Sequence, residues 1–214
     1  MRPAAPEDRA DDLLYVSARR YYDAFAGGEA AARRMLRRVH LRPGHPASVS
    51  LCRVAEAGER IVGVIVGFPA ADGEQLARRF VALTAPRIAP WRWPRLVRHL
   101  NAATGLSPNP PAGSWYVDAL AVAEDARRQG VARALLADAE AIARAAGATG
   151  VALDTGLENA AARRLYEASG FEQRDIRRAR DERAARALGG TGFVGFFKPL
   201  ALTPNDTERR RSGR

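Results

Sequence analysis

The run from residue 114 to residue 176 constrains the fold most, because its hydrophobic periodicity alternates regularly between two types. Three short apolar segments are typical of strands: Ser114–Ala123, Gly150–Asp154 and Gly170–Ile176. Two alanine-rich segments with helical periodicity separate them, Gln129–Ala146 and Asn159–Ser169. A β-α-β-α-β order of this kind indicates an α/β protein.

The rest of the chain predicts further elements around this run. We expect helices over Pro6–Ala26, Glu29–Val39 and Ala71–Leu83. Strands Ser48–Glu56 and Arg60–Phe68 should form a hairpin, and Gly192–Leu200 a final strand. The highly charged segment Arg177–Leu188 is compatible with a helix. Residues 85–112 are rich in proline and tryptophan, which favours a functional loop or lid. We therefore expect one domain over residues 1–203, with an insertion on the substrate side around 71–112 and a disordered basic tail over 204–214.

The charge balance argues against a dedicated nucleic-acid binder. The formal net charge is +10, but Lys198 is the only lysine and the arginines are spread from Arg2 to Arg214 without a basic run interleaved with aromatics. We therefore expect no nucleic-acid partner, although such a field favours acidic ligands.

Cysteine content and hydropathy bear on the compartment. The single cysteine, Cys52, excludes an intrachain disulfide and any multi-cysteine metal site. The longest apolar stretches, such as Ile61–Pro69, are far shorter than the roughly 20 residues that cross a bilayer. We expect a cytoplasmic protein with no membrane contact and no bound metal.

The strand-to-helix connection after residue 114 carries the strongest signal of a site. The strand Trp115–Val122 leads into a turn with a glycine, Gly130, and a small residue, Ala132, at the start of the following helix. Backbone N–H groups at a helix start lack intrahelical partners, and glycine lets an anion approach closely. The spacing alone is compatible both with phosphate binding and with an α/β unit that holds no ligand.

Two motifs together resemble the GNAT family of N-acetyltransferases. The run Arg127-x-x-Gly130-x-Ala132, preceded by Leu120–Val122, is similar to the acyl-CoA motif of that family. Glu158–Phe171, with an Asn and a Tyr on one helix that ends in Gly-Phe, resembles the second motif of the family. The motifs occur in the family's order, and the first residues and the Ser48–Phe68 hairpin also look like its opening.

The resemblance implies a central mixed, mostly antiparallel sheet of six to seven strands, flanked by helices and split between two parallel strands where acyl-CoA lies. It implies acetyl-CoA or another acyl-CoA as donor and an amine-bearing small molecule or protein as acceptor, and it leaves a homodimer open. The residues expected to bind acyl-CoA are Leu120, Ala121, Val122, Arg127, Arg128, Gln129, Gly130, Val131, Ala132, Arg133, Asn159 and Ala162.

Asn159 and Tyr166 are seven residues apart, two helical turns, so they lie on one side of their helix. Taken alone, Asn159 is compatible with a helix N-cap and Tyr166 with a core aromatic. The resemblance implies that Asn159 binds the pantetheine arm and that Tyr166 protonates the departing thiolate of CoA. A phenol suits this role because its usual pKa, about 10, keeps it protonated at neutral pH.

Asp118 is the best candidate for the base that takes a proton from the amine. We expect it to alternate with Tyr116 and Leu120 on one face of an otherwise apolar strand. A partner for an arginine, or a binder of a cationic substrate, remains an open alternative.

The other conspicuous side chains carry weaker signals. We expect His40, His45 and His99 at the surface or in loops, Cys52 buried and inert, and the tryptophans either around the acceptor or packed within the insertion (Trp91, Trp93, Trp115). An N-acyltransferase is therefore the favoured function. A non-catalytic acyl-CoA sensor and an arginine-rich nucleic-acid binder with salt-dependent affinity are the alternatives.

Overall fold

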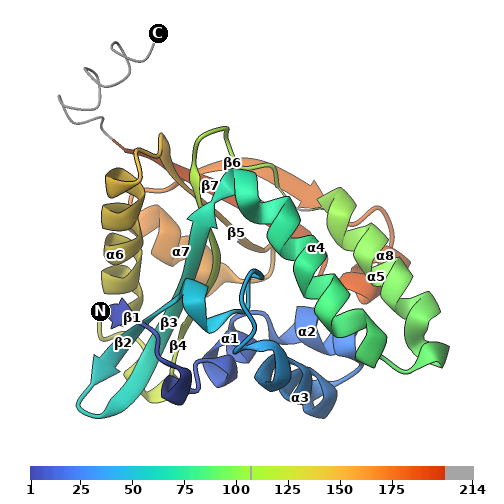
Figure 1. Ribbon diagram of the computed structural model, residues 1–214. Helices are drawn as coiled ribbons and strands as arrows, with labels where there is room; N and C mark the ends of the chain where they lie inside the picture. Colours follow the sequence, from blue (N-terminus) through green and yellow to red (C-terminus); the bar gives the residue numbers. More distant parts are fainter. Residues whose placement is uncertain (107, 201–214) are drawn as a thin grey trace, which may run out of the picture.

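The computed structural model describes residues 1–106 and 108–200, through which a single sheet runs (Figure 1). The sheet has seven strands in the order β1-β2-β3-β4-β5-β7-β6, and β4 and β5 are its only parallel neighbours among the described residues. This confirms the mixed, mostly antiparallel sheet. The strands are β1 (Arg2–Pro3), β2 (Cys52–Ala57), β3 (Arg60–Pro69), β4 (Trp115–Val122), β5 (Gly150–Gly156), β6 (Glu172–Arg178) and β7 (Gly192–Pro199).

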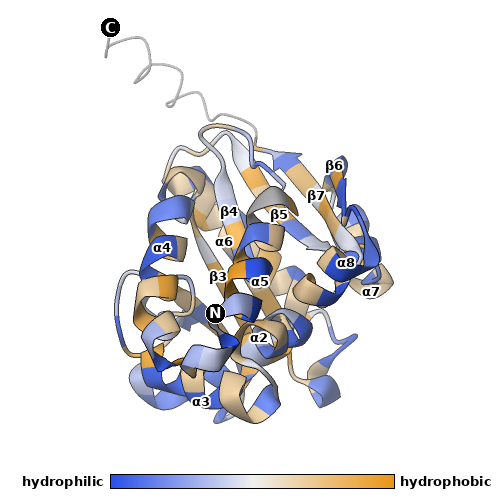
Figure 2. Ribbon diagram, turned by 90° about the vertical axis from the view of Figure 1, so that its right-hand side faces the viewer, coloured by the Kyte–Doolittle hydropathy of each residue, from blue (hydrophilic) through white to orange (hydrophobic). Residues whose placement is uncertain are grey.

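Helices cover both faces of the sheet and divide the hydrophobic core in two. The described helices of seven residues or more are α1 (Asp11–Ser17), α2 (Arg19–Ala26), α3 (Glu29–Val39), α4 (Gly73–Thr84), α5 (Trp93–Leu106), α6 (Val131–Ala145), α7 (Ala160–Ala168) and α8 (Glu182–Leu188). Residues of α1 to α5 form one buried cluster with one face of the sheet, and residues of α6 and α7 form a second cluster with the other face. Figure 2 shows hydrophilic and hydrophobic residues alternating along α4 and α5, as expected for helices with one buried side.

The central strands are buried because both of their faces are covered. In β3, Val64 and Val66 belong to the cluster under α1 to α5, whereas Val62 and Ile65 pack under α6. On α6, Leu135 is completely buried and meets this second face. Such burial explains why these strands read as nearly continuous β-branched runs rather than as alternating ones.

The parallel pair β4 and β5 is joined only at its start. Trp115, Tyr116 and Val117 pair with residues 151–153, and no pairing continues beyond Val117 although both strands run on. The edge of β4 that faces β5 is therefore left without a strand partner from Asp118 onward. We call these diverging segments the β4–β5 split.

A β-bulge places Asp118 at the beginning of this split. On β3, Val66 pairs with Ala119 and Gly67 pairs with Val117, so Asp118 has no partner. Because the extra residue reverses the alternation, Tyr116 packs with the cluster under α1 to α5, whereas Leu120 packs with the cluster under α6. The expected alternation of Asp118 with Tyr116 and Leu120 on one face is therefore wrong.

Two segments upstream of the split differ from the sequence prediction. The helix expected over residues 6–26 is interrupted by Arg9, with a φ of 51°, and by Ala18, so that α1 packs on β4 while α2 turns toward α3, α5 and α8. The strand expected from Ser48 begins at Cys52, after a short turn of 3-10 helix over Val49–Leu51.

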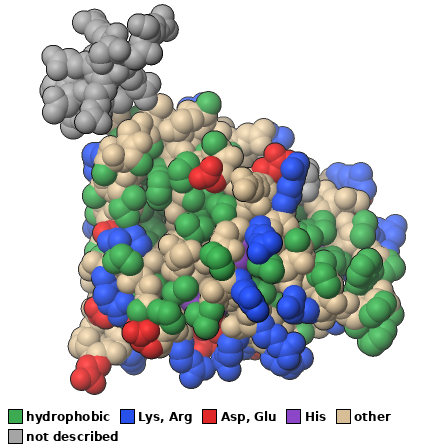
Figure 3. All heavy atoms as spheres, viewed as in Figure 1, with side chains coloured by type: hydrophobic (Ala, Val, Ile, Leu, Met, Phe, Trp, Pro, Cys, Tyr) green, Lys and Arg blue, Asp and Glu red, His purple; other side chains and the backbone are tan. Residues whose placement is uncertain are grey.

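The proline-rich segment is helical over much of its length instead of forming a loop or lid. The prolines of its first half lie at the starts of helices, where a missing backbone N–H costs little. Pro86 and Pro90 lie in the first turns of 3-10 segments, and Pro94 is the second residue of α5. Figure 3 shows hydrophobic side chains gathered at the end of the molecule where α4 passes into α5, and Trp91 there is 81% exposed. The tail predicted over 204–214 lies outside the described residues.

Candidate functional site

The turn into α6 has the backbone conformation of an anion cradle. Gly130 is the N-cap of α6, with a φ of 82°, and Arg128 before it also has a positive φ, 61°. A Cβ placed at Gly130 would meet no atom within 4 Å, so the space above the turn is open. The positive φ favours glycine here, and the open space leaves room for a ligand.

The donors around this turn are available. No side chain caps α6, so the N–H groups of Val131, Ala132 and Arg133 lie in a first turn without intrahelical acceptors. Gln129 donates its side-chain amide to the Asp125 carbonyl at 2.9 Å, which holds the turn.

The arginines of the turn are exposed, and most have no acidic partner. Arg127 donates to the Val122 carbonyl at 3.3 Å, whereas Arg128 and Arg133 form no ion pair with any described residue. Free N–H groups, the helix dipole and unpaired guanidinium groups together fit a pyrophosphate.

Asn159 is the N-cap of α7. Its side-chain oxygen accepts from the Ala162 N–H at 3.2 Å, and its amide donates to Thr155 Oγ1 at 3.1 Å. The interpretation of Asn159 as a helix N-cap is thus confirmed. The backbone N–H of Ala162 is already used in this hydrogen bond. One amide hydrogen of Asn159 remains for another acceptor, so the pantetheine contact stays a prediction.

Tyr166 is buried on the side of α7 that meets the sheet. Its ring packs against Phe171 and Phe196, with centroid distances of 6.1 and 5.5 Å. Burial, together with the negative charge of Asp154, raises the pKa of Tyr166 well above its usual value. The phenol is therefore protonated at neutral pH, as a proton donor must be.

Two carboxyl groups and a phenol meet where β4 and β5 diverge. The Tyr116 hydroxyl donates a hydrogen bond to Asp154 Oδ2. Part of the Asp118 side chain is exposed. Its pKa is nevertheless raised to about 7, chiefly because the surrounding protein desolvates the carboxyl and also because Asp154 repels its charge. Desolvation raises the pKa of Asp154 to about 6, against the opposing effect of the Tyr116 hydrogen bond. Both carboxyls would change charge near neutral pH, where a general base works best.

Sequence reasoning missed Asp154 and the hydroxyl of Tyr116. A signal was present, because Asp154 ends the apolar run of the strand Gly150–Asp154, and the carboxyl ends of parallel strands are where α/β proteins bind ligands. Residue Tyr21 of α2 lies near Asp118. Burial, with a smaller contribution from the charge of Asp118, raises the pKa of Tyr21 to about 12.

The raised pKa of Asp118 predicts a pH-dependent stability. In the folded state Asp118 keeps its proton up to about pH 7, whereas the unfolded chain releases it near the ordinary value of 3.8. The folded state therefore binds more protons across this window, and its stability declines as pH rises through it. We expect Asp118→Asn to raise the melting temperature more at about pH 8 than at about pH 5, and to change it little below about pH 4, as measured by calorimetry. An equal change at both pH values would contradict this.

The three histidines are buried, so a surface position is wrong for all of them, whereas His40 and His45 do lie in a loop and His99 lies on α5. Each ring donates to a backbone carbonyl, His40 to Ala47 and His45 to Val39 at 2.8 and 2.9 Å, and His99 to Ala187 at 2.7 Å. Desolvation lowers the pKa of His45 and His99. Buried rings of this kind tie helices and loops together.

Cys52 is buried as predicted, and desolvation raises the pKa of its thiol to about 12. A thiol with so high a pKa is a poor nucleophile. Of the tryptophans, Trp115 packs in the core beside Gly67, whereas Trp91 and Trp93 are exposed. No helix in the described ranges is long and apolar enough to span a membrane.

Comparison with known proteins identifies the family to which this chain and its fold belong. The model of the acetyltransferase (GNAT) family matches residues 14–171. The crystal structure of an acetyltransferase superposes with a TM-score of 0.66 at 19% identity, covering 94% of this chain and 98% of the other. An N-acetyltransferase from Staphylococcus aureus Mu50 superposes with a TM-score of 0.66 at 16% identity, covering 92% and 98%. A mutant agmatine N-acetyltransferase in its apo form gives a TM-score of 0.56 at 17% identity, covering 93% and 98%.

The chain belongs to the GNAT family of acetyltransferases. No curated protein matches it significantly in sequence. The similar structures, all below a quarter identical, show the fold, and the family supports acyl transfer in general.

Proposed function

We propose that this protein is an N-acyltransferase that moves an acetyl or similar acyl group from acyl-CoA to a primary amine by direct attack in a ternary complex. The observation that carries the proposal is the β4–β5 split, which ends the pairing of β4 at Val117. It leaves an unpaired strand edge between the anion cradle of α6 and the group formed by Asp118, Asp154 and Tyr166.

The residues along this edge suit the two parts of an acyl-CoA. The open turn at Gly130 and the free N–H groups of Val131–Arg133 would hold the pyrophosphate, with Arg128 and Arg133 adding charge. Leu120, Ala121 and Val122 would offer backbone groups to the pantetheine arm and the acyl carbonyl, because the β5 side of β4 has no strand partner there.

The groups at the start of the split suit the bonds that change. The amine nitrogen forms a bond to the acyl carbon and the C–S bond breaks, giving an amide and a free thiol. Asp118, with its pKa raised to about 7, would take the proton that the amine loses. Tyr166, kept protonated by burial, would give its proton to the thiolate. Most of the acceleration would come from positioning the two substrates.

The proposal predicts how the rate depends on pH. With acetyl-CoA and a reactive amine, kcat/KM should rise through about pH 7 as Asp118 loses its proton. Asp118→Asn should remove that rise and lower kcat by about 100-fold, measured as thiol release. Asp154→Asn serves as the comparison. If Asp154 were the base instead, kcat/KM of the wild type would rise at lower pH, because the pKa of Asp154 is about 6. A variant at 118 that changed KM alone would show that Asp118 binds the cation and is not the base.

A further inference from the structure

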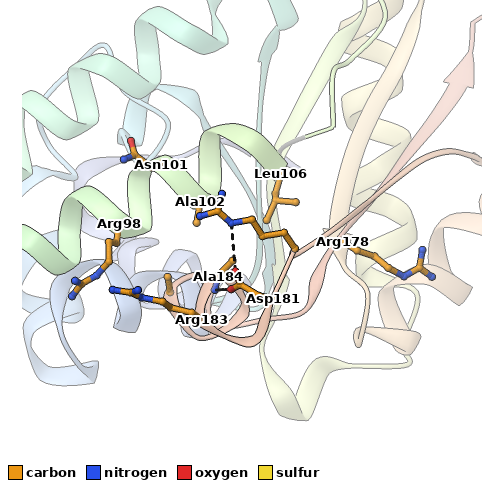
Figure 4. Close-up of a pocket in the computed structure, with 10 residues that line it drawn as sticks. Arg98, Asn101, Ala102, Leu106, Arg178, Asp181, Arg183 and Ala184 are labelled. Carbon is orange, nitrogen blue, oxygen red and sulfur yellow. Dashed lines mark hydrogen bonds and ion pairs between the residues drawn. The ribbon is translucent and has the colours of Figure 1, made fainter.

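A pocket of about 570 Å³ lies between α5 and the segment that leads from β6 into α8 (Figure 4). Four arginines line it, Arg98 on α5 and Arg178, Arg180 and Arg183 on the other wall, with a single acid, Asp181. We call it the arginine pocket. Its volume falls within the range of sites that hold small molecules.

The one acid of the pocket is already engaged. Asp181 is the N-cap of α8, and its side chain accepts from the Ala184 N–H at 2.7 Å. It also pairs with Arg180 at 3.5 Å. These contacts leave the pocket with excess positive charge.

The remaining arginines of the pocket form no ion pair in the described part of the chain, although the charge of Asp181 also interacts with Arg183. Figure 4 shows Arg98 and Arg183 converging from the two walls, while Arg178 extends away from them. Neither Arg98 nor Arg183 forms an ion pair or a side-chain hydrogen bond with any residue in the described ranges. By contrast, Arg177 on the same strand as Arg178 pairs with Asp175 at 2.7 Å. Two converging cations that form no ion pair with an acid favour an anionic ligand.

The pocket walls are fixed and partly apolar. Ala102 and Leu106 of α5 face Ala184 and Ala187 of α8. The buried ring of His99 donates to the Ala187 carbonyl at 2.7 Å and so fastens the two helices to each other. The pocket therefore suits an anionic group attached to a hydrocarbon portion.

The arginine pocket lies on the same strand, β6, as a small hollow that reaches Asp154 of the split. This hollow is lined by Asp154 and by Asp175 of β6, and Arg178 lies three residues farther along the same strand. At the strand rise of about 3.3 Å per residue, this separation is about 10 Å. On the opposite wall, Leu106 lines the arginine pocket and Pro108 lines the hollow.

We propose that the arginine pocket binds a carboxylate or phosphate group of the acceptor. On the proposed function, the acceptor is then an amine whose nitrogen lies near Asp118 and Asp154 and whose anionic group lies in the arginine pocket. The acidic residues attract the amine and the arginines attract the other end, so the site selects a zwitterionic acceptor over a simple alkylamine.

Matched acceptors test the proposal. Octylamine, ω-aminooctanoate and ω-aminooctyl phosphate share one chain and differ in the distal group. We expect the wild type to prefer at least one anionic acceptor over octylamine by about tenfold or more in kcat/KM. The variant Arg98→Ala/Arg183→Ala should lose this preference through a higher KM and keep its kinetics with octylamine. The control, Arg79→Ala/Arg95→Ala, removes two exposed, unpaired arginines of α4 and α5 outside the pocket and should keep the preference.

A binding measurement separates the pocket from the acyl-CoA site. Calorimetric titration with octylphosphonate, without acetyl-CoA, should show binding to the wild type and to Gly130→Glu and none to Arg98→Ala/Arg183→Ala. Unchanged binding to the double variant, or loss of binding in Gly130→Glu, would overturn the inference.

The two proposals fail in different ways. If octylamine is acetylated but neither anionic acceptor is preferred, the arginine pocket does not bind the acceptor and the proposed function stands. If no amine consumes acetyl-CoA, the proposed function and the acceptor assignment fail together, whatever octylphosphonate does.

Discussion

Replacing Gly130 with glutamate is expected to abolish binding of acetyl-CoA, weakening it at least 100-fold in a calorimetric titration. A carboxylate at this position would lie in the open space above the turn, where Val131, Ala132 and Arg133 present their free N–H groups. It would repel the pyrophosphate and would itself satisfy the donors. The positive φ of 82° adds strain of about 1 to 2 kcal/mol for any side chain.

Gly147 at the other end of α6 provides a matched control. It also has a positive φ, 69°, and a Cβ placed there would also meet no atom within 4 Å. Gly147→Glu therefore imposes a similar strain and the same change of charge on the same helix. It should destabilise the fold to a similar extent and leave acetyl-CoA binding unchanged. Equal loss of binding in both variants would show that Gly130 acts through stability and not through the ligand.

Replacing Tyr166 with phenylalanine is expected to lower kcat by about 100-fold or more, with little change in the Kd for acetyl-CoA. The ring would keep its packing against Phe171 and Phe196, and only the hydroxyl would be lost. Stopped assays of thiol release, together with titration of acetyl-CoA, separate the two quantities.

Tyr15 supplies the control for this substitution. It is completely buried, and its hydroxyl donates to Asp23 at 3.0 Å, so it takes part in none of the proposed reaction steps. Tyr15→Phe should cost about 1 kcal/mol of stability and leave kcat unchanged. If Tyr166→Phe retained full kcat, the buried phenol would be a packing residue and another donor would have to protonate the thiolate.

The second half of the chain was predictable because local pattern and tertiary environment agree there. The strand at 115–122, the helix from 131 and the helix from 160 all lie within two residues of the segments predicted from periodicity. Gly130 was singled out because it directly precedes the predicted helix and lets an anion approach closely, and the structure adds that it adopts a positive φ.

Other features depend on contacts that periodicity does not encode. The bulge at Asp118 is set by how β4 pairs with β3, so a simple alternation assigned Tyr116 and Leu120 to the same face. Residues 93–106 form α5, but the prolines around the start of this helix favoured a loop in the sequence prediction. The burial of His99 depends on α8, 88 residues away in the chain.

The arginine pocket shows the same limit for the site. Arg98 and Arg183 come together only because α5 packs on α8, and sequence analysis registered both merely as part of a dispersed positive charge. Asp154 became a candidate only when the structure brought it to the hydroxyl of Tyr116.

The central claim is that the β4–β5 split supports acyl transfer to an amine, and a coupled assay tests it most directly. The wild type is incubated with acetyl-CoA and a panel of primary amines between about pH 6 and about pH 9, while thiol release and the acetylated amine are both quantified. The account predicts equal amounts of the two products, absent in Gly130→Glu and strongly reduced in Tyr166→Phe. Tight acetyl-CoA binding without any acetylated amine across the panel would contradict it and would favour a non-catalytic acyl-CoA sensor.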